Sequence, residues 1–136
     1  MEHRVLGHEE LADRWGDLKD YVNESLIHGI GDVTAHDLFI ECLQNISQCW
    51  VLEDEDELVG VAITRILRYT KYSELVIVTT TTDNWFEVGP RVLEDIEQFA
   101  RDVDCKYTSL YGRKGWVRAL KKYGYEQPYT ILMKEV

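Results

Sequence analysis

The sequence predicts an α/β (α+β) fold, in which a single mixed sheet of about six strands carries helices on both faces. Apolar residues recur at helical spacing in some segments and form short β-branched runs in others, which gives the order β-α-α-β-β-β-α-β-α-β. Three consecutive strands favour antiparallel hairpins, whereas the strand-helix-strand unit at residues 74–111 favours a parallel pair with a right-handed crossover. The length of 136 residues suits one domain, residues 1–136, with one core.

The first third of the chain is predicted to form one strand and two helices. His3–Leu6 is a short strand, and apolar residues at every third or fourth position predict a helix over residues 9–27. The second helix begins after Thr34, because Asp37 three residues later completes a capping box. Its apolar stripe continues to Ile46.

Three strands are predicted in the middle of the chain. Cys49–Leu52 is an apolar strand, the acidic run Glu53–Glu57 forms a turn, and Leu58–Tyr69 is a long strand with apolar residues on one face. The β-branched run at residues 74–79 is typical of a buried strand. The polar residues Thr79–Asn84 are predicted to form a loop after it.

A helix follows this loop. An apolar stripe predicts the helix at about residues 88–103, with Pro90 in its first turn, where the N–H that proline lacks needs no partner. The free N–H groups of such a helix start favour an anion in the loop. The elements that remain are a strand at Lys106–Tyr111, a short helix at Trp116–Leu120 that ends at Gly124, and a last strand at Tyr129–Met133.

The net charge of −10 is unevenly distributed. Residues 1–58 contain fifteen acidic and three basic residues, whereas residues 59–136 contain ten acidic and twelve basic ones. This balance argues against nucleic acid as the main partner. It suits a cationic ligand near the first half and an anionic ligand near the second, and the alternative is a solvated acidic face.

The sequence also predicts where the protein is found and what it does not bind. No apolar run approaches the ~20 residues of a membrane span, so we expect no membrane insertion. The N-terminus lacks a signal-peptide stretch, and the three cysteines have no disulfide-framework spacing, so we expect a cytoplasmic protein with reduced thiols. His28, Asp32 and His36 lack a compact ligand spacing, so no metal site is predicted.

Two segments carry a resemblance to a known family. Gly115–Tyr125 resembles the motif A-x-x-F-Y-x-x-x-G-F of the penultimate helix in the GNAT superfamily of N-acetyltransferases. Glu97–Cys105 is similar to the E-x-A-x-x-x-G-C end of the acyl-CoA helix of that family, and the element order matches over nearly the whole chain. The resemblance implies acetyl-CoA as cofactor and acetyl transfer to a primary amine of a small molecule or a protein.

The family also suggests a second possibility, because small GNAT-like proteins with divergent motifs occur among tailed-phage proteins, some of them in virions. The alternative function is therefore a non-catalytic structural or interaction protein with protein partners. In that case we expect Trp85 and Phe86 to fill the former coenzyme site.

The loop that binds the coenzyme A pyrophosphate in this family reads Arg/Gln-x-x-Gly-x-Gly/Ala, and it corresponds to residues 84–89 here. Gly89 matches the pattern, Asn84 replaces the Arg/Gln, and Glu87 replaces the first glycine. A glutamate there adds bulk and a negative charge near phosphate. The cofactor-binding residues implied by the resemblance are Val78, Thr79, Asn84, Gly89, Arg113, Arg118 and Lys122.

Two residues are candidates for proton transfer. The family's tyrosine that protonates the leaving thiolate corresponds to Leu120, so Tyr123, one helical turn later, is the candidate acid. The family's frequent strand glutamate falls near Val76, and Glu74 on the same face is the candidate base. The alternatives are a packing tyrosine and a solvated carboxylate. For the basic residues of the last helix, the alternative is likewise a solvated face.

Overall fold

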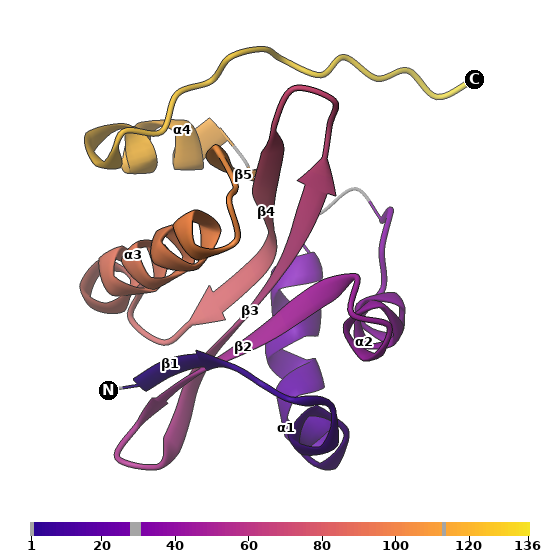
Figure 1. Ribbon diagram of the computed structural model, residues 1–136, viewed down its shortest axis with the longest axis vertical. Helices are drawn as coiled ribbons and strands as arrows, with labels where there is room; N and C mark the ends of the chain where they lie inside the picture. Colours follow the sequence, from indigo (N-terminus) through magenta and orange to yellow (C-terminus); the bar gives the residue numbers. More distant parts are fainter. Residues whose placement is uncertain (1, 28–30, 113) are drawn as a thin grey trace.

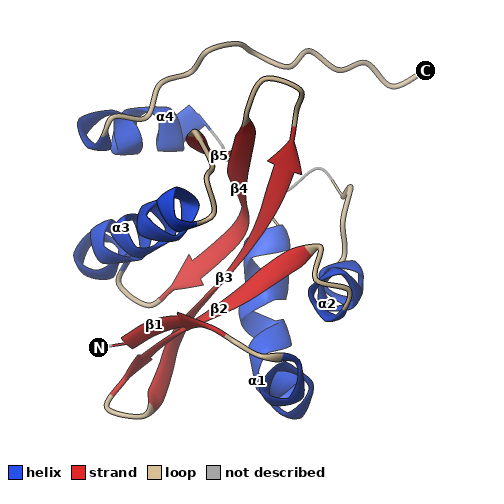
Figure 2. Ribbon diagram, viewed as in Figure 1, coloured by secondary structure: helices blue, strands red, loops and turns tan. Residues whose placement is uncertain are grey.

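The computed structural model describes residues 2–27, 31–112 and 114–136, which form one mixed five-stranded sheet with helices on both faces (Figures 1 and 2). The strands are β1 (Glu2–Val5), β2 (Ser47–Asp54), β3 (Glu57–Arg68), β4 (Ser73–Thr82) and β5 (Tyr107–Leu110). The helices are α1 (His8–Leu26), α2 (Ala35–Leu43), α3 (Trp85–Asp102), α4 (Lys114–Leu120) and the 3-10 helix η1 (Lys121–Tyr123).

The strands lie in sequence order, β1-β2-β3-β4-β5. The first four are antiparallel, whereas β4 and β5 are parallel, with Glu74 opposite Tyr107 and Ile77 opposite Leu110. The predicted parallel pair joined by a helix is therefore confirmed. The predicted capping box at the start of α2 is also confirmed, since Asp37 N–H donates to Thr34 Oγ1 (3.1 Å) and Thr34 N–H donates to Asp37 Oδ2 (2.9 Å).

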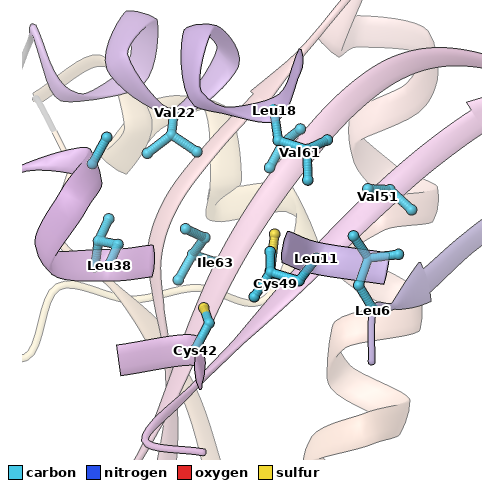
Figure 3. Packing of buried hydrophobic residues seen from close by; sticks show 11 residues of the cluster. Leu6, Leu11, Leu18, Val22, Leu38, Cys42, Cys49, Val51, Val61 and Ile63 are labelled. Atoms are coloured by element: carbon cyan, nitrogen blue, oxygen red, sulfur yellow. The ribbon is translucent and has the colours of Figure 1, made fainter. Parts of the chain in front are cut away.

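The core has one layer on each face of the sheet. Helices α1 and α2 cover one face, and α3 and α4 cover the other (Figure 2). The layer under α1 and α2 is shown in Figure 3 and includes Leu6, Leu11, Leu18, Val22, Leu38, Cys42, Cys49, Val51, Val61 and Ile63. The layer under α3 and α4 consists of Trp50, Leu52, Ala62, Leu75, Ile77, Val88, Val92, Leu93, Ile96, Ala100 and Leu120.

The structure corrects the prediction of a sixth strand. Tyr129–Met133 is not part of the sheet, and the chain after Tyr125 has no regular secondary structure. Figure 1 shows this end of the chain running extended past the turn between β3 and β4. The local pattern of apolar residues predicts an extended conformation, but a strand also needs a neighbour for its backbone groups.

The structure also moves the boundary between β4 and α3. The expected loop at Thr79–Asn84 is wrong, because β4 continues to Thr82, and α3 begins at Trp85. Threonine is β-branched and suits a strand, so the four consecutive threonines lengthen β4. Pro90 is therefore inside α3 and beyond its first turn, where it cannot donate to the Phe86 carbonyl.

The cysteines are free thiols, and burial raises the pKa of Cys42 and of Cys49 to about 12. Among the described helices, none has both the length and the apolarity that crossing a membrane requires.

Candidate functional site

Strand β4 extends beyond the point where its pairing with β5 ends. The last parallel pair joins Ile77 to Leu110, but β4 continues to Thr82. On the side where β5 has ended, the backbone groups of residues 78–82 have no strand partner within the described ranges. We refer to this segment as the open edge of β4. It leads directly into the N-terminus of α3, so it combines free backbone groups with a helix start.

A β-bulge lies at the start of the open edge. Thr64 pairs with Ile77 and Ile63 pairs with Thr79, so Val78 has no partner in β3. The extra residue turns two successive side chains to the same face. Val78 packs against the core layer under α1, and the Thr79 hydroxyl donates to Ser25 Oγ in α1.

The bulge also determines which threonines face α3. Thr80 and Thr82 lie opposite Ala62 and Gly60, on the face that α3 covers. A Cβ on Gly60 would approach Thr82 Cγ2 to 2.8 Å, so glycine is required for this close contact. The Oγ1 atoms of Thr80 and Thr82 are buried and have no hydrogen-bond partner among the described residues. Buried hydroxyls are normally satisfied, so this pair is a candidate ligand contact.

A carboxylate of the helix itself, that of Glu87, lies at the N-terminus of α3. Asn84 has a left-handed backbone (φ 53°), and its carbonyl accepts from the N–H groups of Glu87 (3.2 Å) and Val88 (3.1 Å). Its side-chain amide donates to Glu87 Oε2 at 2.6 Å. The Glu87 carboxylate therefore lies at the positive end of the helix dipole, close to the N–H groups that an external anion would use.

Two tryptophans connect this helix start to α4. A Cβ on Gly89 would approach the Trp85 ring to 2.6 Å, so Gly89 provides room for the indole. Trp85 meets Trp116 edge-on, with 4.8 Å between ring centroids and 89° between ring planes. Phe86 is 90% exposed. Of the two aromatic residues that were expected to fill a former coenzyme site, Trp85 packs inward and Phe86 does not.

The two candidate catalytic residues lie in different surroundings. Glu74 is at the start of β4, at the opposite end of the strand from Asn84, and accepts a hydrogen bond from the Tyr69 hydroxyl (2.8 Å). This hydrogen bond raises the pKa of Tyr69 to about 12. Tyr123 is in η1 and lines a pocket of about 250 Å³ formed with Pro90, Leu93, Glu94 and Glu97 of α3. The structure brings Asn84 and Gly89 together at the start of α3, and Val78 and Thr79 together at the bulge.

The basic residues of the last helix are exposed. Arg118 is on α4, and Lys122 is on η1 with its Nζ 5.2 Å from the centroid of the Tyr123 ring. Neither forms an ion pair with a residue in the described part of the chain, while Arg113 lies outside it. Leu120, at the position of the family's tyrosine, is buried in the core.

Sequence reasoning did not identify Tyr125, which joins three elements. Its hydroxyl donates to Glu97 Oε2 of α3 (3.0 Å) and lies 2.8 Å from Thr108 Oγ1 of β5. Burial is the main reason that its pKa is raised to about 12. Its N–H donates to the Leu120 carbonyl (3.3 Å), beyond the left-handed Gly124 that ends η1. Gly124 was the sequence signal that could have identified Tyr125, because the residue after a glycine cap often packs back on the helix.

Comparison with known proteins identifies the fold. No family model matches the sequence, and no curated protein matches it. Solved structures do match. An aminoglycoside acetyltransferase from an uncultured soil metagenomic sample, in complex with sisomicin, has a TM-score of 0.73 at 15% identity, over 99% of this chain and 95% of that chain. A GNAT family acetyltransferase from Staphylococcus aureus has a TM-score of 0.65 at 15% identity, over 99% and 98%.

A predicted acetyltransferase from Clostridium acetobutylicum, with acetyl-CoA, has a TM-score of 0.70 at 14% identity, over 98% of this chain and 95% of that chain. At these identities the likeness concerns the fold. The chain therefore has a GNAT-like fold, as the sequence motifs implied.

Proposed function

We propose that this protein is a GNAT-like N-acetyltransferase, which uses acetyl-CoA to acetylate a primary amine. The observation that carries the proposal is the open edge of β4, with its bulge at Val78 and the unpartnered hydroxyls of Thr80 and Thr82. The likeness to acetyltransferase structures, one of them with acetyl-CoA, supports it. We expect such a protein to act in the cytoplasm.

The residues at the open edge of β4 fit the pantetheine arm of acetyl-CoA better than the start of α3 fits its pyrophosphate. The amide-rich pantetheine arm would pair with the free backbone groups of residues 78–82, including those of Val78 and Thr79. The pyrophosphate would lie at the start of α3, near Asn84 and Gly89. There the Glu87 carboxylate has to rotate away first, because like charges at this distance repel. Arg118 and Lys122, with Arg113, would attract the remaining phosphate.

The chain would contribute mainly by positioning the reactants. Bound acetyl-CoA supplies a thioester, whose carbonyl carbon the amine nitrogen attacks as the C–S bond breaks and the thiolate leaves. In our proposal Glu74 receives one ammonium proton through water before the attack, and Tyr123 gives a proton to the leaving thiolate. The second proton that the amine nitrogen loses then restores Tyr123. Because Glu74 and Tyr123 lie apart from each other, each would exchange its proton with the reactants through a chain of water molecules.

The acceptor we propose is a cationic primary amine of a small molecule or a protein. Residues 1–58 carry a formal charge of −12, which raises the local concentration of cations near that half of the chain. We propose that the acceptor lies against the acidic first half of the chain and residues 28–35, of which residues 28–30 lie outside the described residues.

Calorimetry and thermal unfolding with acetyl-CoA test the proposal. A ligand at 100 times its dissociation constant adds about 2.7 kcal/mol to the free energy of unfolding, which a thermal scan detects. Release of free thiol in the presence of a polyamine or a lysine peptide then tests for catalysis. Absence of any heat of binding at millimolar acetyl-CoA would contradict the proposal.

A second candidate function is a non-catalytic structural or interaction protein on the same fold, for example a component of a tailed-phage particle with protein partners. The observations that favour it are the Glu87 carboxylate at the start of α3, the Trp85–Trp116 contact and the buried Leu120. Micromolar binding of acetyl-CoA by the unmodified protein would exclude this candidate.

A further inference from the structure

A cavity of about 280 Å³ lies between the start of α1, the end of α2 and the start of β2. Part of its wall is apolar and belongs to the core layer in Figure 3, namely Leu6, Leu11, Cys42 and Cys49. The hydroxyls of Thr80 and Thr82 lie on the other face of the sheet, which α3 covers. The cavity is therefore separate from the proposed coenzyme site.

The start of α1 lines this cavity and has no cap. The N-cap residue is Gly7, which has no side chain, and the first helical hydrogen bond runs from the Leu11 N–H to the Gly7 carbonyl (2.9 Å). The N–H groups of His8, Glu9 and Glu10 have no acceptor within the described ranges. Ser, Thr, Asp or Asn usually supplies one at this position. Without it, water or a ligand has to accept these hydrogen bonds, and the helix dipole favours an anion.

Ser47, at the start of β2, independently indicates a ligand in the same cavity. The residue lines the cavity and is 4% exposed. Its Oγ is buried and has no hydrogen-bond partner in the part of the chain that the structure describes. Because buried hydroxyls are normally satisfied, we expect an acceptor atom from outside the chain to lie beside it.

Asn45 adds a further donor to the cavity. Its backbone is left-handed (φ 60°) and ends α2. His8 Nε2 donates to Asn45 Oδ1 (2.8 Å), which leaves the amide N–H groups of Asn45 available. The last carbonyls of α2 are already used, since Cys42 accepts from the Asn45 N–H and Glu41 accepts from the Ile46 N–H. The available polar groups are therefore donors, and they suit a ligand that accepts hydrogen bonds.

The acidic residues in the first turn of α1 do not exclude an anion. Arg4 donates to both carboxylate oxygens of Glu10 (2.9 and 2.6 Å), and Arg14 donates to one of them (3.3 Å). These two guanidinium groups offset the charge of Glu10. Glu9 is exposed, so water and salt screen its charge.

We propose that this cavity binds a short aliphatic monocarboxylate. The carboxylate oxygens accept hydrogen bonds from the free N–H groups of α1, the Ser47 hydroxyl and the Asn45 amide. The carbon chain lies against the apolar part of the wall. The cavity is smaller than the ~300–1,000 Å³ of sites for drug-sized ligands, so a chain of a few carbons fits it. This inference does not depend on the proposed function.

Titration of the full chain with sodium butyrate, followed by the backbone amide signals in NMR, tests the proposal. The signals of His8, Glu9, Glu10 and Ser47 should shift and reach saturation, with sodium chloride at equal ionic strength as the reference. Butyramide has a similar chain without the charge and should bind at least tenfold more weakly. Acetate lacks most of the chain and should also bind more weakly. Shifts confined to the start of α3, no saturation, or equal affinity for butyramide would overturn the proposal.

Gly7→Asp supplies the missing cap from the chain itself. The Gly7 backbone (φ −73°, ψ 167°) suits any residue, and a Cβ there would have nothing within 4 Å. The variant should have a higher Tm and at least a tenfold lower affinity for butyrate. Gly16→Asp is the matched control, because it adds the same charge at an exposed position of α1, about 13 Å further along the helix. It should bind butyrate as the original protein does.

Ser47→Ala tests the buried hydroxyl. The hydroxyl has no partner to lose, so the Tm without butyrate should not fall. The affinity for butyrate should fall several-fold, and the increase in Tm that butyrate gives should shrink with it. Unchanged affinity in Gly7→Asp or in Ser47→Ala would contradict the proposed site.

Discussion

Trp85 and Trp116 meet edge to face, with 4.8 Å between their ring centroids, and so connect the first turn of α3 to α4. Both indoles are half-buried against the core layer under these helices. Aromatic pairs of this geometry contribute about 0.5–1.5 kcal/mol beyond the area they bury. We therefore predict that Trp116→Ala lowers the free energy of unfolding by about 2 kcal/mol, measured by urea denaturation.

Trp116→Phe is the control for this prediction, because it keeps an aromatic edge in the contact. It should lose less than half as much stability as Trp116→Ala. Equal losses in the two variants would show that an aromatic edge against Trp85 does not account for the effect.

Glu87 provides the sharpest test of the coenzyme site. Glu87→Gly removes the carboxylate at the start of α3 and permits close approach to the backbone. If acetyl-CoA binds there, affinity should rise at least tenfold, or about 1.4 kcal/mol, in calorimetry. If the site no longer binds coenzyme, the variant should only lose stability slightly through backbone entropy.

Glu87→Gln separates charge from backbone freedom. The glutamine keeps an oxygen that accepts from the Asn84 amide and removes the negative charge. Most of the gain should appear in this variant if repulsion of phosphate is the cause. A gain confined to Glu87→Gly would instead point to the glycine backbone.

The charges of Arg118 and Lys122 predict that the affinity for acetyl-CoA depends on ionic strength. Arg118→Glu with Lys122→Glu should weaken acetyl-CoA binding and flatten its dependence on ionic strength, because both side chains are exposed and free of ion pairs with described residues. Titration at two salt concentrations measures this. Lys71→Glu, in the turn between β3 and β4, is the charge-reversal control for each of the two single substitutions. Unchanged affinity in the double variant would assign Arg118 and Lys122 to a solvated face.

The buried position of His3 predicts how the free energy of unfolding depends on pH. Its ring stacks on Trp50 (4.7 Å between centroids), with Nδ1 3.4 Å from Asp95 Oδ2 and its side chain 1% exposed. Burial lowers the pKa of His3 below 6.5, against the opposing effect of Asp95, and Arg91 lowers it further. The unfolded chain then binds the proton more readily, so the free energy of unfolding should fall as the pH drops below 6.5.

Urea denaturation at pH 7.5 and pH 5 measures this loss. His3→Phe keeps a ring against Trp50 without a titratable group, so its stability should change less between the two values. The pKa of Glu10 is lowered to about 2 by its hydrogen bond with Arg4, so its contribution is lost only at more acidic pH. A variant as acid-sensitive as the original protein would exclude His3 as the cause.

Local signals in the sequence predicted most of the fold. Helical periodicity and the Thr34–Asp37 capping box identified α1 and α2, and the strand-helix-strand unit identified the parallel pair of β4 and β5. The prediction of a strand at Tyr129–Met133 was wrong for a physical reason. The apolar pattern shows which side chains share a face, but it does not show whether another strand is available to pair with the backbone.

The candidate site was harder to predict than the fold. The family motif placed Asn84, Glu87 and Gly89 in a loop before the helix, whereas in the structure Asn84 directly precedes α3 and the other two lie within α3. The two unpartnered hydroxyls of Thr80 and Thr82 were missed, because their direction depends on a one-residue irregularity in the ladder with β3. Four threonines in a row carry no alternation from which the bulge could be inferred.

The bulge also gives β4 one residue more than its ladder with β3 needs. If Val78 were deleted, Ile77 and Thr79 would follow each other as regular neighbours opposite Thr64 and Ile63, and the later threonines would keep their faces. The strand would lose its local bend and added twist. A chain shortened by this one residue should therefore still fold, yet hold a straighter β4 beyond its last pair with β5.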